Sequence, residues 1–185
     1  MDNGASSYRR FLQGDDSGFV EIVRDYKDGL ILYLNGFTND IHIAEDLAED
    51  TFVKLGVKKP KDKRNASFKT WLYTMGRNLA IDYLRKQKKS VQVSLDSLPE
   101  ISLEEEWLEG SYLKKEQKIN LHKAIKGLKP EYASVIYLTY FEGFSNKETA
   151  KIMKKSLHNI ETLLFRARKS LRSQLNKEDF SYEEL

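Results

Sequence analysis

Residues 145–172 read SNKETAKIMKKSLHNIETLLFRARKSLR, and this stretch predicts a short helix, a tight turn and a longer second helix. Ser145 followed by Glu148 is a capping box, a pattern that opens a helix. The turn lies at residues 154–156, where a serine can cap the next helix. Apolar residues then recur at helical spacing over residues 157–175 and form an inward stripe. The pattern predicts a helix-turn-helix unit, although a plain helical hairpin in a bundle would share it.

The outward face of the second helix carries hydrogen-bonding groups near its start and basic groups further on. In a helix-turn-helix, residues near the start of the second helix reach base edges in the major groove, while Arg and Lys hold phosphates. This composition therefore favours binding to duplex DNA. The face consists of His158, Asn159, Thr162, Phe165, Arg166, Lys169 and Arg172.

The rest of the chain is also helical by pattern. Apolar residues follow a helical period over residues 16–35, 41–56 and 67–88, and no run alternates as a half-buried strand would. Pro130 is placed to start a further helix. Residues 90–103 combine a proline, several serines and weak periodicity, which indicates a linker. We therefore expect an all-α protein with two small helical domains joined by a flexible linker.

Charge divides the chain in the same way. The net charge of the 185 residues is only +3, although 32% of them are charged. Two basic blocks separated by an acidic spacer suggest a polyanion as partner, although most charge runs are simply solvated faces. The net charges are −7 for residues 1–52, +10 for 53–90, −6 for 91–110, +9 for 111–175 and −3 for 176–185. The expected units are a first domain at 1–90, an acidic linker at 91–111, a second domain at 112–176 and a C-terminal tail at 177–185.

Composition argues against most enzyme and membrane classes. The chain has no Cys, which excludes disulfides, thiolate metal sites and cysteine nucleophiles. Its three His are far apart, His42 and His122 are expected to face solvent, and no phosphate-binding Gly-rich loop is present. We expect no enzyme activity, no catalytic residue, no metal, no cofactor and no small-molecule substrate. No apolar run of about 18 residues and no signal-peptide pattern occur, so we expect a soluble, cytoplasmic protein.

Several motifs resemble bacterial RNA polymerase sigma factors. Residues 142–153 (EGFSNKETAKIM) and 165–171 (FRARKSL) look like sigma region 4. Residues 44–52 (AEDLAEDTF) resemble region 2.2, and residues 67–85 (SFKTWLYTMGRNLAIDYLR) resemble regions 2.3 and 2.4. The motifs follow the family's order over about residues 8–176. With only regions 2 and 4, joined by a short linker, the chain is similar to the extracytoplasmic-function type (ECF, group IV).

The resemblance implies core RNA polymerase as a partner. An acidic helix face would dock on the clamp coiled coil of the largest subunit, and the second-largest subunit would contribute its flap. Without the resemblance, a solvated surface would explain the same carboxylates. The family is usually held inactive by an anti-sigma factor, often a membrane-bound one, so we expect such a partner, which could hold the protein at the membrane. The implied polymerase-binding residues are Glu45, Asp46, Glu49 and Asp50.

The resemblance also implies promoter DNA as a partner at two elements. Basic, aromatic and amide groups in a loop and on the outward face of helix 67–88 would melt and hold the minus-ten element. The helix-turn-helix would bind the minus-thirty-five element. The implied minus-ten contacts are Lys61, Lys63, Arg64, Asn65, Ser67, Lys69, Tyr73, Arg77, Asn78 and Arg85. The implied minus-thirty-five contacts are Lys154, Lys155, Ser156, His158, Asn159, Thr162, Phe165, Arg166 and Lys169.

One departure from the family's pattern lies on the recognition helix. Many members carry basic residues where this chain has Glu161 and Leu163. Glu161 should repel phosphate but can accept a hydrogen bond from a cytosine amino group. The expected function is a sigma factor that directs promoter recognition and transcription initiation of a dedicated regulon. The alternatives are a stand-alone helix-turn-helix transcriptional regulator, which leaves the acidic face unexplained, and an enzyme acting on nucleic acid, for which the sequence offers little.

Overall fold

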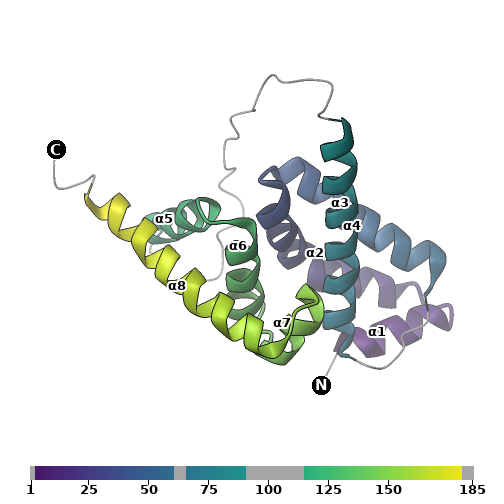
Figure 1. Cartoon of the computed structure of the whole chain (residues 1–185). Helices are drawn as coiled ribbons and strands as arrows, with labels where there is room; N and C mark the ends of the chain where they lie inside the picture. Colours follow the sequence, from purple (N-terminus) through teal and green to yellow (C-terminus); the bar gives the residue numbers. More distant parts are fainter. Residues whose placement is uncertain (1–2, 61–65, 91–114, 181–185) are drawn as a thin grey trace.

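The computed structural model describes residues 3–60, 66–90 and 115–180, and all regular structure in these ranges is helical. This confirms the all-α expectation, whereas the predicted linker at 91–111 lies outside the described residues. The N-terminal domain consists of α1 (Asn3–Leu12), α2 (Ser17–Thr38), α3 (Ile41–Lys58) and α4 (Phe68–Ser90). The C-terminal domain consists of α5 (Lys115–Lys126), α6 (Pro130–Ile136), the short π-helix η3 (Tyr137–Phe141), α7 (Asn146–Met153) and α8 (Leu157–Phe180). Figure 1 shows the two domains side by side, with α4 at their junction.

The N-terminal domain is built around α2, which contacts α1, α3 and α4 and is most deeply buried in its second half. Leu30, Ile31 and Leu34 of α2 are all 0% exposed because residues three and four apart lie on one helix face. The Asp40 side chain caps α3 by accepting hydrogen bonds from the backbone N–H groups of His42 and Ile43. The three helices predicted at 16–35, 41–56 and 67–88 are thereby confirmed as α2, α3 and α4 to within a few residues.

The C-terminal domain contains the predicted helix-turn-helix in α7 and α8. The capping box is present: the Ser145 side chain accepts from the Glu148 N–H, and the Glu148 carboxylate accepts from the Ser145 N–H. Ser156 caps α8 by accepting a hydrogen bond from the Asn159 N–H at 3.2 Å. Pro130 occupies the first turn of α6, where its missing N–H costs nothing. Local sequence signals therefore set the starts of these three helices.

One helix was not predicted, and one prediction of local structure needs correction. Helix α1, for which no local pattern was identified, is held by the buried Tyr8 and Phe11, with the Tyr8 ring 5.5 Å from that of Phe68 on α4. A short helix of this kind depends on tertiary packing rather than on propensity. His122 was expected to face solvent, but it is half-buried, its Nδ1 lies 3.3 Å from the Tyr137 hydroxyl, and burial lowers its pKa.

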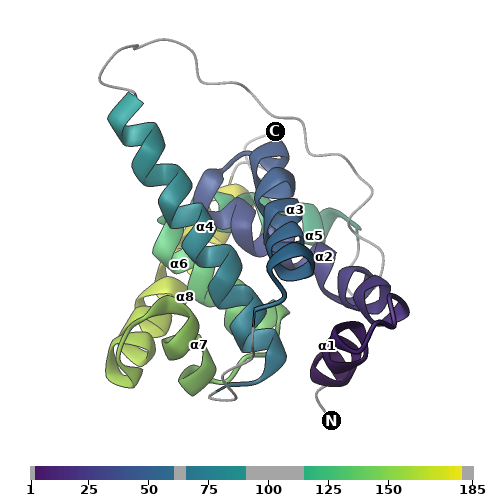
Figure 2. The same cartoon turned by 90° about the vertical axis from the view of Figure 1, so that its right-hand side faces the viewer.

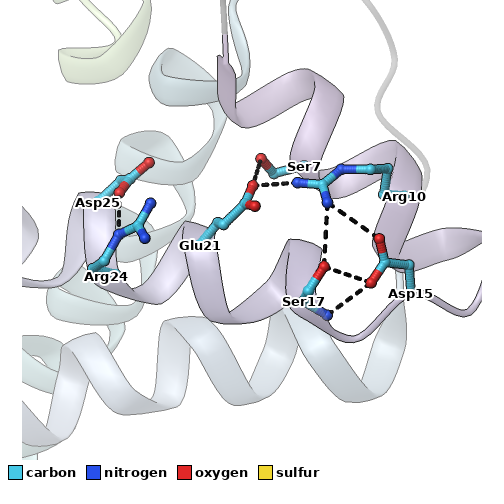
Figure 3. Close-up of polar contacts among 7 residues, drawn as sticks. All are labelled: Ser7, Arg10, Asp15, Ser17, Glu21, Arg24 and Asp25. Carbon is cyan, nitrogen blue, oxygen red and sulfur yellow. Dashed lines mark hydrogen bonds and ion pairs between the residues drawn. The ribbon is translucent and has the colours of Figure 1, made fainter.

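A polar network joins α1 to α2 (Figure 3). The Arg10 guanidinium contacts the Glu21 carboxylate and also bonds Asp15 at 3.1 Å. Glu21 also accepts a hydrogen bond from the Ser7 hydroxyl at 2.7 Å. Asp15, rather than Asp16, caps the start of α2 by accepting from the Ser17 N–H at 3.0 Å. Hydrogen bonds from Arg10 and Ser7 lower the pKa of Glu21, and those from Ser17 lower the pKa of Asp15.

The Arg10–Glu21 contact should make the stability of the N-terminal domain depend on pH. A carboxyl whose pKa is lower in the folded state stabilises the fold above its unfolded pKa, which for Glu21 is 4.5, and loses this contribution as the pH falls further. Glu21→Gln should therefore destabilise the protein at pH 7, and the gap to wild type should narrow between pH 5 and about pH 3. Urea unfolding followed by circular dichroism at several pH values measures the gap. A gap independent of pH would contradict this assignment.

Candidate nucleic-acid interface

The outward face of α8 is open to solvent. His158, Asn159 and Arg166 are exposed, and the Phe165 ring is 65% exposed although it is large and apolar. The opposite face is buried through Ile160, Leu164 and Ala167, whereas Leu157, at the start of the stripe predicted to face inward, is 38% exposed. A long helix held by one face and preceded by a tight turn can enter a major groove with its other face. The structure thus brings together the predicted contacts His158, Asn159, Thr162, Phe165, Arg166 and Lys169 on one helix face.

The turn before α8 places two lysines differently. Lys154 is exposed and adopts a left-handed conformation (φ 53°), the geometry that glycine favours at a helix end. Lys155 is half-buried and forms a 3.2 Å ion pair with Glu131 at the start of α6. Glu131 is 62% exposed in its side chain, so the pair lies at the surface and water screens it. Lys154 is therefore free to face a phosphate, while Lys155 is partly neutralised.

The predicted acidic strip, which lies within the helix expected at residues 41–56, is on α3. Asp46, Glu49 and Asp50 are exposed, and the Glu45 side chain is 38% exposed with its carboxylate 3.4 Å from His42 Nδ1. Leu47 and the other inward residues anchor the helix, so its acidic strip stays at the surface. The same helix carries exposed apolar side chains one and two turns further on, at Val53 and Val57.

The face of α4 that was predicted to hold the minus-ten element is largely covered. Tyr73 was placed on the outward face, and this was wrong, because its side chain is 0% exposed. Its ring lies 5.5 Å from Tyr33 on α2 and 5.1 Å from Phe144 of the C-terminal domain. Tyr73 is therefore enclosed from two sides, by α2 of its own domain and by Phe144 of the C-terminal domain. Burial and the neighbouring Glu142 carboxylate raise the pKa of Tyr73.

Lys69 lies at the centre of this contact. Its ammonium donates to the Glu142 carboxylate at 2.9 Å and to the Glu142 backbone oxygen at 2.8 Å. It also lies 4.9 Å from the centre of the Phe144 ring, within range of a cation–π interaction. The side chains of Lys69 and Glu142 are 30% and 15% exposed, so the pair is more shielded than the surface pair of Lys155. Sequence reasoning assigned no function to Glu142 or Phe144, and no local signal could have, because their partners are about 70 residues away in the chain.

The remaining predicted minus-ten residues are half-buried, exposed or outside the described residues. Ser67 is half-buried, and its hydroxyl lies 3.4 Å from the carboxylate of Glu148 on α7. Arg77 is half-buried, with its Nε fully buried and without a hydrogen-bond partner among the described residues, whereas Arg85 is exposed near the end of α4. Asn78 is half-buried. The loop residues Lys61, Lys63, Arg64 and Asn65 lie outside the described residues.

Other kinds of site find no support within the described residues. No cluster of three or more His, Asp and Glu side chains that could hold a metal ion is present in residues 3–60, 66–90 and 115–180. In the same ranges, no helix combines the length and the apolar character needed to cross a membrane.

Comparison with known proteins gives the same family for both domains. Residues 22–90 match the family model of Sigma-70 region 2, and residues 118–171 match that of Sigma-70, region 4. The ECF RNA polymerase sigma factor SigM of Bacillus subtilis (strain 168) is 32% identical over 157 residues, which cover 85% of this chain and 94% of SigM. SigW of the same organism, also an ECF sigma factor, is 29% identical over 171 residues, covering 88% of this chain and 91% of SigW.

Solved structures of sigma factors share the fold. The sigma factor RpoE from Bartonella quintana, in complex with the anti-sigma factor NepR, matches with a TM-score of 0.67 and 25% identity over 85% of this chain and 96% of that one. CnrH, in complex with the cytosolic domain of CnrY, matches with a TM-score of 0.61 and 19% identity over 95% and 96% of the two chains, which indicates the fold alone. Together with the exposed helix-turn-helix on α8 and the acidic strip on α3, these matches show that the chain belongs to the ECF type of RNA polymerase sigma factors, with regions 2 and 4.

Proposed function

We propose that this protein binds core RNA polymerase through α3 and reads promoter DNA through α4 and α8, and so directs transcription initiation of a dedicated regulon. The observation that carries the proposal is one chain presenting both an exposed acidic strip and an exposed helix-turn-helix face, in the two regions that match sigma factors. Sigma factors are not a class of enzymes, and the proposed role requires no catalytic residue in this chain.

The two surfaces suit different partners. The carboxylates of Asp46 and Asp50 are one helical turn apart on α3, a spacing that suits a basic partner helix such as the clamp coiled coil of the largest polymerase subunit. The C-terminal domain would meet the flap of the second-largest subunit. The outward face of α8 is suited to the minus-thirty-five element, and Ser67, Lys69, Tyr73, Arg77, Asn78 and Arg85 are proposed for the minus-ten element, together with the loop before α4.

A stand-alone regulator is less well supported. It would use α7 and α8 but would leave the acidic strip on α3 without a role.

An anti-sigma factor is a further proposed partner, since the relatives RpoE and CnrH were each solved in complex with another protein, which for RpoE is the anti-sigma factor NepR. The proposal needs no cofactor, and it places the protein where transcription occurs, in the cytoplasm.

Reconstituted transcription tests the proposed function directly. Purified core polymerase with this protein should produce specific transcripts from a genomic fragment library, and neither component alone should do so. Binding to defined duplexes without any association with core polymerase would instead establish the stand-alone regulator.

Neutralising the acidic strip should weaken the complex with core polymerase. Asp46→Asn with Asp50→Asn should reduce affinity about tenfold, on the order of 1.4 kcal/mol, because two charges facing a basic surface are lost. Fluorescence anisotropy of labelled protein titrated with core polymerase measures the change. The matched control is Asp25→Asn with Asp28→Asn, two exposed acids on α2, which should leave the affinity unchanged. Equal effects of both pairs would show that only net charge matters.

Removing one cation from α8 should change the salt dependence of duplex binding. Arg166→Ala should weaken binding to the minus-thirty-five element and reduce the slope of log affinity against log salt by about one, the value for one phosphate contact. The matched control is Arg168→Ala, which is also exposed but lies about 200° around the helix. An Arg166→Ala slope equal to that of wild type would remove Arg166 from the phosphate contacts.

A further inference from the structure

We propose that the contact between the two domains is an autoinhibitory latch, in which carboxylates of the C-terminal domain occupy the α4 surface that the minus-ten strand would otherwise contact. The inference rests on the proposed function, because it concerns the promoter residues assigned there. The latch is built from Glu142, Phe144 and Glu148 on one side and Ser67, Lys69, Thr70 and Tyr73 on the other.

Glu142 satisfies the charge of Lys69 in the closed arrangement. Lys69 is the cation at the start of α4, and Glu142 provides it with both a carboxylate oxygen and a backbone oxygen, at 2.9 and 2.8 Å. A phosphate would make the same two kinds of contact, an ion pair and a short hydrogen bond. In the observed arrangement Glu142 therefore takes the place of a phosphate, and DNA must displace it to reach Lys69.

The groups beside Lys69 also face the C-terminal domain. One carboxylate oxygen of Glu148 lies 3.4 Å from both the Ser67 and the Thr70 hydroxyl, and the Phe144 ring meets the Tyr73 ring edge-on at 5.1 Å. Hydroxyls and a tyrosine ring are groups that could receive a phosphate and an unstacked base. The two hydroxyls, which also bond each other at 2.8 Å, both face the Glu148 carboxylate, and the tyrosine ring faces Phe144.

The rest of the interface is close-packed and shared by α2 and α6. A Cβ atom at Gly36 of α2 would lie 3.7 Å from the Cβ of Ala133 and 3.8 Å from the Tyr137 ring. These are ordinary van der Waals distances, so a small side chain fits at position 36 without displacing α6. Figures 1 and 2 agree in placing α7 beside the first half of α4. The interface therefore includes a contact between α4 and α7 as well as the contact between α2 and α6.

The latch covers one functional surface and leaves the others open. The acidic strip on α3 and the outward face of α8 remain exposed in the closed arrangement, whereas Tyr73 is 0% exposed. Core polymerase can therefore dock on α3 before the domains separate. If polymerase binds the open arrangement more tightly than the closed one, docking shifts the population toward the state that accepts the minus-ten strand.

A disulfide across the α2–α6 contact tests the latch. The chain has no native cysteine, so Gly36→Cys with Ala133→Cys creates a single possible pair, at a Cβ separation close to the 3.8 Å mean of disulfides. The pair should form readily under mild oxidation of the free protein. The oxidised protein should still associate with core polymerase, but its yield of open promoter complexes should fall at least about tenfold. Reduction of the disulfide should restore the yield. Each single-cysteine variant should be insensitive to oxidation.

The outcomes separate the inference from the proposed function. Failure of the pair to form, open complexes that are equally abundant in both redox states, or loss of core binding on oxidation would each overturn the latch while leaving the promoter role intact. Absence of promoter-directed transcription in wild type and in the reduced variant would instead overturn the proposed function, and the latch with it.

A charge-neutral variant provides a second test. Glu142→Gln in the two-cysteine background should slow disulfide formation and increase open complexes in the reduced state, because Lys69 loses its counter-charge while the shape is kept. Added salt should slow the reaction in the parent protein more than in the Glu142→Gln variant. Glu131→Gln is the matched control for the disulfide reaction, since this carboxylate belongs to the same domain but pairs with Lys155, and it should leave the rate of disulfide formation unchanged. Equal disulfide rates for all three proteins would remove Glu142 from the latch.

Discussion

The contact between the two domains centres on one cation, Lys69, and its counter-charge, Glu142. The Lys69 side chain lies at the start of α4 near the Tyr73 and Phe144 rings and is 30% exposed, a partly shielded position where an opposite charge close by is favourable. When the two domains are in contact, Glu142 provides that charge. When promoter DNA is bound, a phosphate would provide it. The same preference for a counter-charge therefore supports both the closed arrangement and the proposed promoter-binding one.

Burial divides the candidate surfaces into two kinds. The strip on α3 and the outer face of α8 are exposed because each helix is held by its opposite, apolar face, so their charges are available whichever way the domains lie. The face of α4 is different because α4 contacts both domains: Tyr73 lies between Tyr33 of α2 and Phe144 of the C-terminal domain. Its accessibility is a property of the whole molecule and not of the helix. This difference would allow one chain to present a polymerase-docking surface while withholding a promoter-melting one.

Most of the local structure was predictable from neighbouring residues. The capping box at Ser145, the cap at Ser156 and the proline at the start of α6 are signals that act over three or four residues, and the structure has helix starts at each of them. The acidic strip was predictable because the opposite face of α3 is plainly apolar. Helix α1 was missed because Tyr8 becomes part of a core only when Phe68 and Trp71, about 60 residues away, pack against it. His122 was assigned to solvent for the same reason, since its contact with Tyr137 requires α5 to lie beside η3.

The sequence by itself determined the all-helical class, the positions of the main helices, the exposed faces of α3 and α8 and the family, because helical period, caps and motifs are all encoded locally. The tertiary structure alone decided that Tyr73 is buried, that Lys69 is paired with Glu142 and that Glu148 serves α4 as well as its own capping box. These facts depend on contacts between residues about 70 to 80 positions apart. No local pattern encodes such contacts, because their formation depends on how two separately folded helical units dock.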